Sequence, residues 1–230
     1  GNAYGPVNSE QVLMLDDLLL GKQGFVPYGT ESANFMLMGR FGNMLLVNGE
    51  PQYELEAMRG EVVRFFFTNV ANTRTFNLSF RPEGGATSLP MKVIATDVSR
   101  FEHQVWADSL VIAPAERYIV EVRFAEPGRV RMVNVVQGIN HRAGSFFTES
   151  KELGVVRVSD DPVDVDLAGS HAMLRVNDDI AKEIGAYRGH SDRPPDHQLI
   201  LRLEVGKLPL VVDQLMALDR VYFNPAEWAG

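Results

Sequence analysis

The chain has 230 residues, of which 45% are apolar, 9% aromatic and 23% charged, a balance typical of a globular protein with a full core. A formal net charge of -8 and scattered Lys and Arg residues support neither a nucleic-acid partner nor an anionic membrane surface. The chain contains no cysteine, which excludes disulfides, thiolate zinc sites, a cysteine nucleophile and the thiolate ligand of a blue-copper centre.

The first ten residues, "GNAYGPVNSE", lack the basic and apolar parts of a signal peptide and are predicted to form a tail. No apolar run approaches the roughly 20 residues that span a bilayer, so no membrane partner is expected. Residues 11–160 are short apolar segments separated by turn residues, which is typical of an antiparallel β-sandwich or barrel. The predicted strands are, in order, "QVLMLDDLLL", "ANFMLMGR", "MLLVNGEPQYEL", "EVVRFFFTNV", "TFNLSF", "MKVIATD", "SLVIAP", "ERYIVEVRF", "GRVRMVNVV" and "LGVVRVS".

An Asn-Gly pair, Asn48-Gly49, lies between two apolar runs and predicts a β-hairpin, because both residues adopt positive φ at little cost. Gly60 marks the turn into "EVVRFFF", where Arg64 lies among apolar residues. Both faces of this strand are expected to be at least partly buried. The strand is therefore predicted to be central, since three consecutive Phe residues on an edge would invite aggregation.

The segment "VIAPAERYIVEVRF" (residues 111–124) predicts two strands around a tight corner, because Pro114 interrupts any helix. Beyond the corner the apolar residues alternate with a period of two. One face, predicted to be core, carries Tyr118, Val120, Val122 and Phe124, and the other carries Ile119, Glu121 and Arg123. This second face is expected to meet solvent or a neighbouring domain.

The composition changes after residue 160. Residues 161–196 are polar, contain a helix-capable stretch at 178–187 and end at a Pro-Pro break, so they are interpreted as a linker with a short helix. The following "HQLILRLEV" predicts another strand. One strand and a tail cannot close a second domain, so residues 197–230 either pack on the first domain or begin a further β domain.

Five of these segments, in this order and spacing, together resemble the middle cupredoxin-like domain of the multicopper oxidases, the laccase and copper-efflux oxidase superfamily. "VLMLDDLLL" resembles the strand that enters that domain, and "NMLLVNGEP" its Leu-Val-Asn-Gly hairpin. "GEVVRFFFTNVANTRTFNLSF" resembles its Arg-x-x-x-x-Asn strand pair, "MKVIATDVSRF" its Ile-x-x-Asp strand, and "SLVIAPAERYIVEVRF" its Pro-x-Glu-Arg-Tyr corner. The resemblance covers about residues 11–136.

The resemblance implies an all-β fold, a cupredoxin-like Greek-key β-sandwich or barrel, followed by a linker and the start of a further β domain. It divides the chain into a tail (1–10), a copper-free middle domain (11–160), an interdomain linker with a short helix (161–196) and the first strands of a truncated third domain (197–230). In that family the outer domains hold a blue copper and a trinuclear copper cluster through His-x-His pairs and a His-Cys-His segment. The histidines here never form His-x-His; they are His103, His141, His171, His190 and His197.

The resemblance therefore implies copper in the parent protein and none in this segment, and we assign no catalytic, cofactor-binding or metal-binding residue. The parent would couple one-electron oxidation of a phenol, an amine or a metal ion to reduction of dioxygen to water. The segment alone is expected to be inactive and to orient the copper-bearing domains. Its expected partners are the flanking cupredoxin domains of the same chain; a homo-oligomer is left open, and the family implies an extracellular or periplasmic location.

Two alternatives belong to other functional classes. The first is a non-catalytic cupredoxin-like scaffold or partner-binding module. The second is an unrelated β-sandwich that binds, for example, carbohydrate. The second needs an exposed row of aromatic residues, which is hard to assemble from Trp106 and Trp228 alone.

Isolated histidines and methionines allow a metal-binding interpretation. His103 and His141 are interpreted as surface residues, because a tight site needs three or four converging ligands. Met36, Met38 and Met44 could offer thioethers to Cu(I), but Met is also a common filler of protein cores, and that role is favoured.

Two acidic pairs and one charged corner complete the candidates. Adjacent carboxylates on a strand point to opposite faces, so Asp16 and Asp17 cannot form an acid/base pair. They and the pair at 178–179 are interpreted as turn, cap or surface groups. Glu116 and Arg117 either line a cleft between domains or fix the corner, with Arg117 bound to backbone carbonyls or to a carboxylate such as Asp97; the structural role is favoured.

Overall fold

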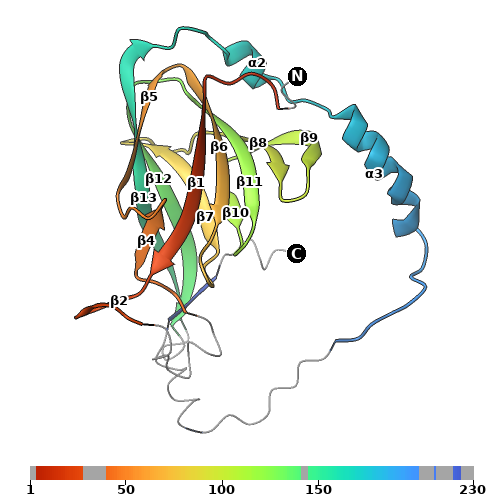
Figure 1. Ribbon diagram of the computed structural model, residues 1–230, viewed down its shortest axis with the longest axis horizontal. Coiled ribbons are helices and arrows are strands. Elements are labelled where there is room, and N and C mark those ends of the chain that lie inside the picture. Colours follow the sequence, from red (N-terminus) through yellow and green to blue (C-terminus); the bar gives the residue numbers. More distant parts are fainter. Residues whose placement is uncertain (1–3, 28–39, 141–144, 202–209, 211–219, 224–230) are drawn as a thin grey trace.

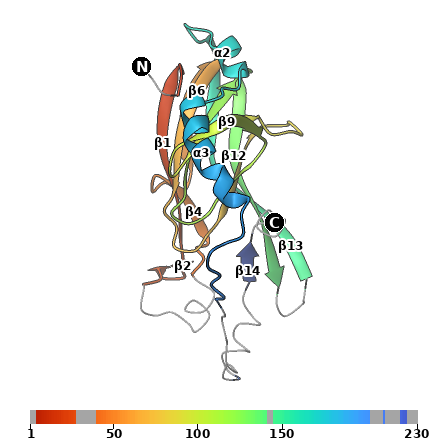
Figure 2. The ribbon, with the colours of Figure 1, turned by 90° about the vertical axis from the view of Figure 1, so that its right-hand side faces the viewer.

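The computed structural model describes residues 4–27, 40–140, 145–201, 210 and 220–223. Most of their strands form two large β-sheets packed as a sandwich (Figure 1 and Figure 2), and β2 (Leu20–Gly21) and β3 (Gly24–Phe25) form a small third sheet. In its strand order, the first sheet consists of β4 (Met44–Val47), β1 (Ser9–Leu18), β6 (Glu61–Asn69), β11 (Arg117–Phe124), β8 (Met91–Thr96) and β9 (Arg100–Ala107). The second consists of β10 (Leu110–Ile112), β7 (Phe76–Pro82), β12 (Gly128–Asn140), β13 (Ser145–Pro162) and β5 (Tyr53–Arg59). The predicted all-β sandwich is thus confirmed.

One apolar core lies between the sheets, because alternate residues of the central strands point inward. Phe65 of β6 has its ring centroid 5.1 Å from that of Phe80 on β7 and 6.4 Å from that of Phe124 on β11. Val120 and Val122 are buried beside them, which confirms the predicted inner face of β11. Strand β6 lies between β1 and β11, so its predicted central position is also confirmed.

Two strand pairs differ from the expected antiparallel arrangement. Strand β1 pairs with β6 in parallel, and β5 pairs with β13 in parallel. Parallel neighbours need a long crossover connection, and the described part of the connection between β1 and β6 contains β2, β3, β4 and β5. The expectation of purely antiparallel pairing was wrong because spacing alone does not show which strands become neighbours.

The Asn-Gly signal produces a turn but no hairpin. Asn48 and Gly49 have φ angles of 52° and 84°, and the turn is closed by two backbone hydrogen bonds of 2.9 Å between Val47 and Glu50. Strand β4 then pairs with β1, whereas β5 joins the other sheet. The Asn48 side chain continues the pairing with β1, since Oδ1 accepts from the Met14 N–H at 2.8 Å.

Edge strand β9 was not predicted, because its polarity pattern is inverted: Gln104 is buried, whereas Val105 and Trp106 are partly exposed. This edge is covered by residues 163–191, which we call the strap. The strap contains the short helix α2 (Ala168–Ala172) and helix α3 (Asp178–Ser191), which lies beside β9 in Figure 2. The predicted helix at 178–187 is therefore present and extends to residue 191.

The C-terminal part differs from the prediction in one respect. Residues 197–201 have no regular structure, so the strand predicted from residue 197 does not begin there. Strand β14 (Arg220–Phe223) pairs with β12, and β2 pairs with β3.

The strand predicted at 33–40 lies almost wholly outside the described residues. The division into domains stays a prediction. Within the described part of the chain, no helix has the length and apolarity to cross a membrane.

Candidate functional site

The corner before β11 is fixed by its two charged residues. Glu116 accepts a hydrogen bond from the Ala113 N–H at 2.7 Å through Oε2, and its own N–H donates to the Ala113 carbonyl at 3.0 Å. Arg117 donates from Nε to Asp97 Oδ1 at 2.8 Å, and its backbone N–H binds the same oxygen at 2.9 Å. The predicted contact between Arg117 and Asp97 is confirmed, and both charges serve the turn.

Asn69 joins this corner to the end of β6. Its Nδ2 donates to the carbonyls of Arg74 at 2.7 Å and Ile112 at 2.9 Å, while Oδ1 accepts from the Ala71 N–H at 3.0 Å. Asn69 is fully buried, so each of these bonds replaces one that water would otherwise make. The Asn of the Arg-x-x-x-x-Asn pattern therefore ties three chain segments together.

The Arg of the same pattern, Arg64, forms a buried ion cluster on the outer side of the first sheet. Its Nη2 lies 2.6 Å from Glu121 Oε1, and its Nη1 lies 2.7 Å from Glu10 Oε1. Lys92 Nζ lies 3.1 Å from the second oxygen of Glu121, and Arg64 Nη2 also donates to the Gly5 carbonyl at 2.9 Å. We call Arg64, Glu121 and Lys92 the buried ion cluster.

The outer face of β11 was expected to meet solvent or a neighbouring domain, and at Glu121, which is only 2% exposed, it does not meet solvent. The chain itself covers this face, through the N-terminal segment near Gly5 and through the strap, whose Met173 carbonyl lies 3.4 Å from Lys92 Nζ. Both carboxylate oxygens of Glu121 bind cations. This arrangement suits a structural role better than proton transfer to a ligand.

The acidic pair on β1 separates into two environments. Asp17 is buried and accepts from Arg74 Nε at 2.7 Å and from the Gly42 N–H at 2.6 Å. Its interpretation as a turn, cap or surface group was therefore wrong. Asp16 is partly exposed and accepts from the Asp17 N–H at 2.8 Å, and partial burial raises the pKa of its carboxyl.

The second acidic pair behaves as expected for a helix start. Asp178 and Asp179 lie in the first turn of α3, where the helix dipole favours negative charge. Asp179 also pairs with Arg100 of β9, and this hydrogen bond lowers the pKa of Asp179. The pair therefore attaches the start of α3 to the edge of the sheet.

The histidines lie apart from one another. His103 is exposed, with Nε2 3.5 Å from Glu102 Oε1, and His190 and His197 are also exposed. His171 of α2 is buried, and His141 lies outside the described residues. Across the described ranges, no group of three or more His, Cys, Asp or Glu side chains could hold a metal ion.

The thioether interpretation is largely untested, because two of its three methionines, at positions 36 and 38, lie outside the described residues. Met44 is partly buried on β4. The absence of a copper site from this segment stays a prediction.

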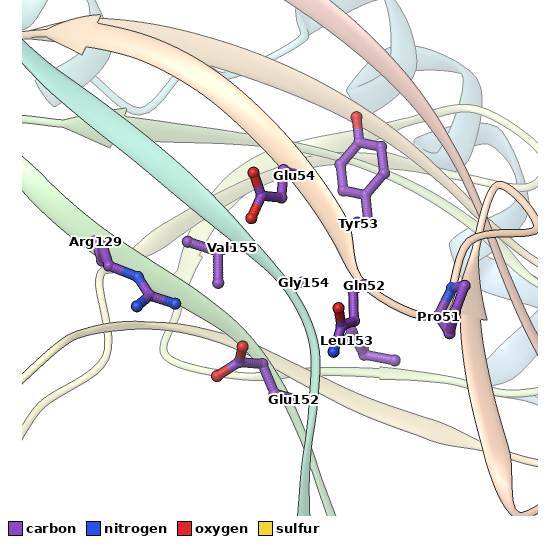
Figure 3. Close-up of a pocket in the computed structure, with 9 residues that line it drawn as sticks. All are labelled: Pro51, Gln52, Tyr53, Glu54, Arg129, Glu152, Leu153, Gly154 and Val155. Atoms are coloured by element: carbon purple, nitrogen blue, oxygen red, sulfur yellow. The ribbon is translucent and has the colours of Figure 1, made fainter.

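A polar groove of about 270 Å³ lies on the second sheet, where β5 begins beside β13 (Figure 3). It is lined by Pro51, Gln52, Tyr53, Glu54, Arg129, Glu152, Leu153, Gly154 and Val155. Glu54 pairs with Arg157, Nη2 to Oε1 at 2.5 Å, which lowers the pKa of the Glu54 carboxyl. Burial and the nearby Glu50 raise the pKa of Tyr53. Two carboxylates, one already paired, do not make a metal or acid/base site.

Sequence reasoning missed the buried ion cluster. Its signal was the placement of Arg64 and Glu121 inside apolar strands, where they turn out to be directly opposite in the pairing of β6 and β11. Lys92 of β8 is likewise opposite Glu121. Opposite charges that face each other across neighbouring strands attract, so this register would have predicted the pair.

Comparisons with known proteins relate part of the chain to copper enzymes. No family model matches the chain. Over 110 residues the chain is 33% identical to bilirubin oxidase from Albifimbria verrucaria. These residues make up 47% of this chain and 19% of that protein.

Solved structures share the fold at low sequence identity. The laccase-like multicopper oxidase CueO from Ochrobactrum sp. has a TM-score of 0.51 and 22% identity, over 70% of this chain and 34% of that one. The McoA 2F4 variant from Aquifex aeolicus has a TM-score of 0.56 and 20% identity, over 70% of this chain and 34% of that one. A multicopper oxidase from Campylobacter jejuni, described as a metallo-oxidase, has a TM-score of 0.55 and 20% identity, over 68% and 31%.

The chain thus spans about a third of each of these structures and about a fifth of bilirubin oxidase. The similarity supports the predicted relation to the multicopper oxidase and laccase superfamily over part of the chain, and it establishes the cupredoxin-like sandwich. The assignment as the middle domain stays a prediction.

Proposed function

We propose that this chain is a portion of a multicopper oxidase, in which it forms a copper-free domain that orients the copper-bearing domains. The 33% identity with bilirubin oxidase over 110 residues carries the proposal. The sandwich fold, which corresponds to about a third of each solved multicopper oxidase, supports it.

The donor groups of the described residues do not fit a copper site. Copper in proteins is held by converging imidazole and sulfur ligands. Among the described residues, His171 is the histidine that is buried. Its ring contacts the ring of Trp106, which cannot bind copper, rather than a second imidazole or sulfur ligand. We therefore assign copper and the reduction of dioxygen to other parts of the parent protein, and derive no catalytic step in this segment.

The role that suits this segment is to keep the neighbouring domains at a fixed spacing and orientation. The corner of Glu116 and Arg117, the bonds of Asn69 and the buried ion cluster each fix the relative position of neighbouring strands. A rigid sandwich of this kind suits a domain whose task is to space its neighbours. Its partners in this proposal are the flanking domains of the same chain, and its location is extracellular or periplasmic.

The first test is copper loading of the 230-residue chain and of the full parent protein. The parent is expected to bind copper, to show blue absorbance and to consume oxygen with a phenolic, amine or metal-ion donor. The isolated chain is expected to do none of these. Blue absorbance or oxygen consumption by the isolated chain would overturn the proposal.

A second test addresses the orienting role within the parent. Glu121→Gln, which weakens the buried ion cluster, is expected to reduce copper occupancy and turnover of the parent. Glu54→Gln, on the exposed face, is the matched control and should leave both unchanged. Full occupancy in a parent whose domain is measurably destabilised would contradict the orienting role.

A non-catalytic scaffold remains the alternative, and no observation on this segment favours it. The two proposals differ in the rest of the parent sequence. Intact His-x-His and His-Cys-His motifs in the flanking domains support an oxidase, and degenerate motifs support a scaffold.

A further inference from the structure

The strap is attached to the edge of the first sheet by backbone and side-chain hydrogen bonds. The Gln104 N–H donates to the Arg175 carbonyl at 3.1 Å, and the Arg175 N–H donates to Gln104 Oε1 at 3.0 Å. One step further, the Asn177 N–H donates to the Glu102 carbonyl at 2.9 Å, and Asn177 Nδ2 donates to the Phe101 carbonyl at 2.6 Å. The strap is thus a docked segment rather than a free linker.

His171 of α2 is the buried titratable group of this contact. Its side chain is closed in so that the residue is only 7% exposed, and its ring lies edge-to-face on Trp106 of β9, with centroids 5.1 Å apart. The Nε2 atom is buried and has no hydrogen-bond partner among the described residues. A second proton on this imidazole would therefore be a buried charge without an acceptor for its N–H, which is unfavourable.

Two positive charges near His171 also oppose its protonation. Strand β8 contributes Lys92, and β11 contributes Glu121 and Arg123, while β9 contributes the neutral ring of Trp106. Burial lowers the pKa of His171 most, and Lys92 and then Arg123 lower it too; a hydrogen bond with the Glu121 backbone and the Glu121 charge act in the opposite direction. The Glu121 carboxylate is also bound to Arg64 and Lys92.

We propose that the strap is a pH-controlled latch, which stays docked on the first sheet while His171 is neutral and is released when His171 becomes protonated. This inference rests on the geometry of α2 and β9 and does not depend on the proposed function. Release would uncover Lys92, which is 4% exposed, and would increase the exposure of Trp106, which is 39% exposed in the docked state. It would also leave residues 163–191 without contacts to the first sheet, so that they connect the sandwich to the residues after 191 as a flexible segment.

The direction of the pH effect follows from linkage. In the released strap His171 has an ordinary pKa of about 6.5, and in the docked strap its pKa is lower. The docked state is therefore fully favoured above about pH 6.5 and loses stability as the pH falls from there through the docked pKa. For each unit by which docking lowers the pKa of His171, acidification below both pKa values raises the ratio of released to docked strap by about tenfold.

The test measures hydrogen exchange of residues 163–191 together with acrylamide quenching of Trp106, at a series of pH values between about pH 8 and pH 5. The background is Trp228→Phe, because Trp106 and Trp228 are the two tryptophans. Exchange, corrected for its intrinsic pH dependence, and quenching are expected to rise together below about pH 6.5. His171→Gln, which has no charged form, should abolish the rise.

The matched controls are His103→Gln and His190→Gln, which remove exposed histidines on β9 and α3 and should keep the rise. A wild type without increased exchange, or a His171→Gln variant with the same increase, would overturn the latch. Where His171→Gln fails to dock even at neutral pH, titration of the wild-type imidazoles by NMR decides. A pKa for His171 no lower than those of His103 and His190 refutes the proposal.

Discussion

Glu121→Gln is expected to destabilise the sandwich strongly, because it leaves two buried cations without their shared counter-charge. The side chains of Arg64 and Lys92 are 0% and 5% exposed, and they bind the two Glu121 oxygens at 2.6 and 3.1 Å. Removing one partner of a buried ion pair costs about 3 to 5 kcal/mol. Glu10 still neutralises Arg64 from a half-exposed position, so we expect the lower end of this range.

The assay is urea unfolding followed by circular dichroism. At an m-value of about 2 to 3 kcal/mol per M, a loss of about 3 kcal/mol lowers the midpoint by roughly 1 to 1.5 M. Glu54→Gln makes the same chemical change in the exposed pair with Arg157 and should leave the midpoint nearly unchanged, because water screens that pair. A midpoint that falls no further in Glu121→Gln than in Glu54→Gln would refute the assigned role of the buried ion cluster.

Three further substitutions test the packing. Phe65→Ala removes the ring at the centre of the aromatic group and is expected to cost about 3 to 5 kcal/mol in urea unfolding; a cost below about 1 kcal/mol would contradict the described core. Gly154→Ala would place a Cβ 2.4 Å from the Tyr53 carbonyl oxygen and should lower the melting temperature, whereas Gly169→Ala, with no atom within 4 Å, should not; equal effects would argue against close approach of β5 and β13. Asn48→Ala removes two side-chain bonds to β1, from the Met14 N–H and to the Val12 carbonyl, and places Ala at a φ of 52°. It is expected to cost at least about 0.5 to 1.5 kcal/mol, and an unchanged melting temperature would show that the two bonds contribute nothing.

The inner face of β11 could be predicted from the sequence because the core imposes a local rule: apolar residues alternate where one face is buried. Val120 and Val122 obey it. What covers the outer face depends on residues more than 40 positions away, such as His171, and no local pattern contains that information. Glu121 was therefore expected to face solvent or a neighbouring domain, although other segments of this chain bury it.

The turn at Asn48 shows the same limit for topology. Positive φ at Asn48 and Gly49 is a local property of the two residues and was predicted correctly. Whether the next strand folds back on β4 or crosses to the other sheet depends on which edge has an open position, and β13 supplies it from the other end of the chain. Edge strand β9 was missed for a related reason, since the strap rather than the core buries Gln104.

The fold and the proposed latch meet at Glu121 but depend on different side-chain contacts, and this makes them separable in experiment. The bond between Arg64 and Glu121 joins β6 to β11 within the sheet, whereas His171 contacts the sheet from outside it, through the ring of Trp106 and a hydrogen bond with the Glu121 backbone. Lys92 belongs to both, through Glu121 and through the Met173 carbonyl. Glu121→Gln should therefore lower the urea midpoint at every pH, while His171→Gln should leave the midpoint at neutral pH close to that of the wild type and remove only the acid response. If both variants changed the same transition in the same way, the strap would have to be counted as part of the folded core rather than as a releasable cover.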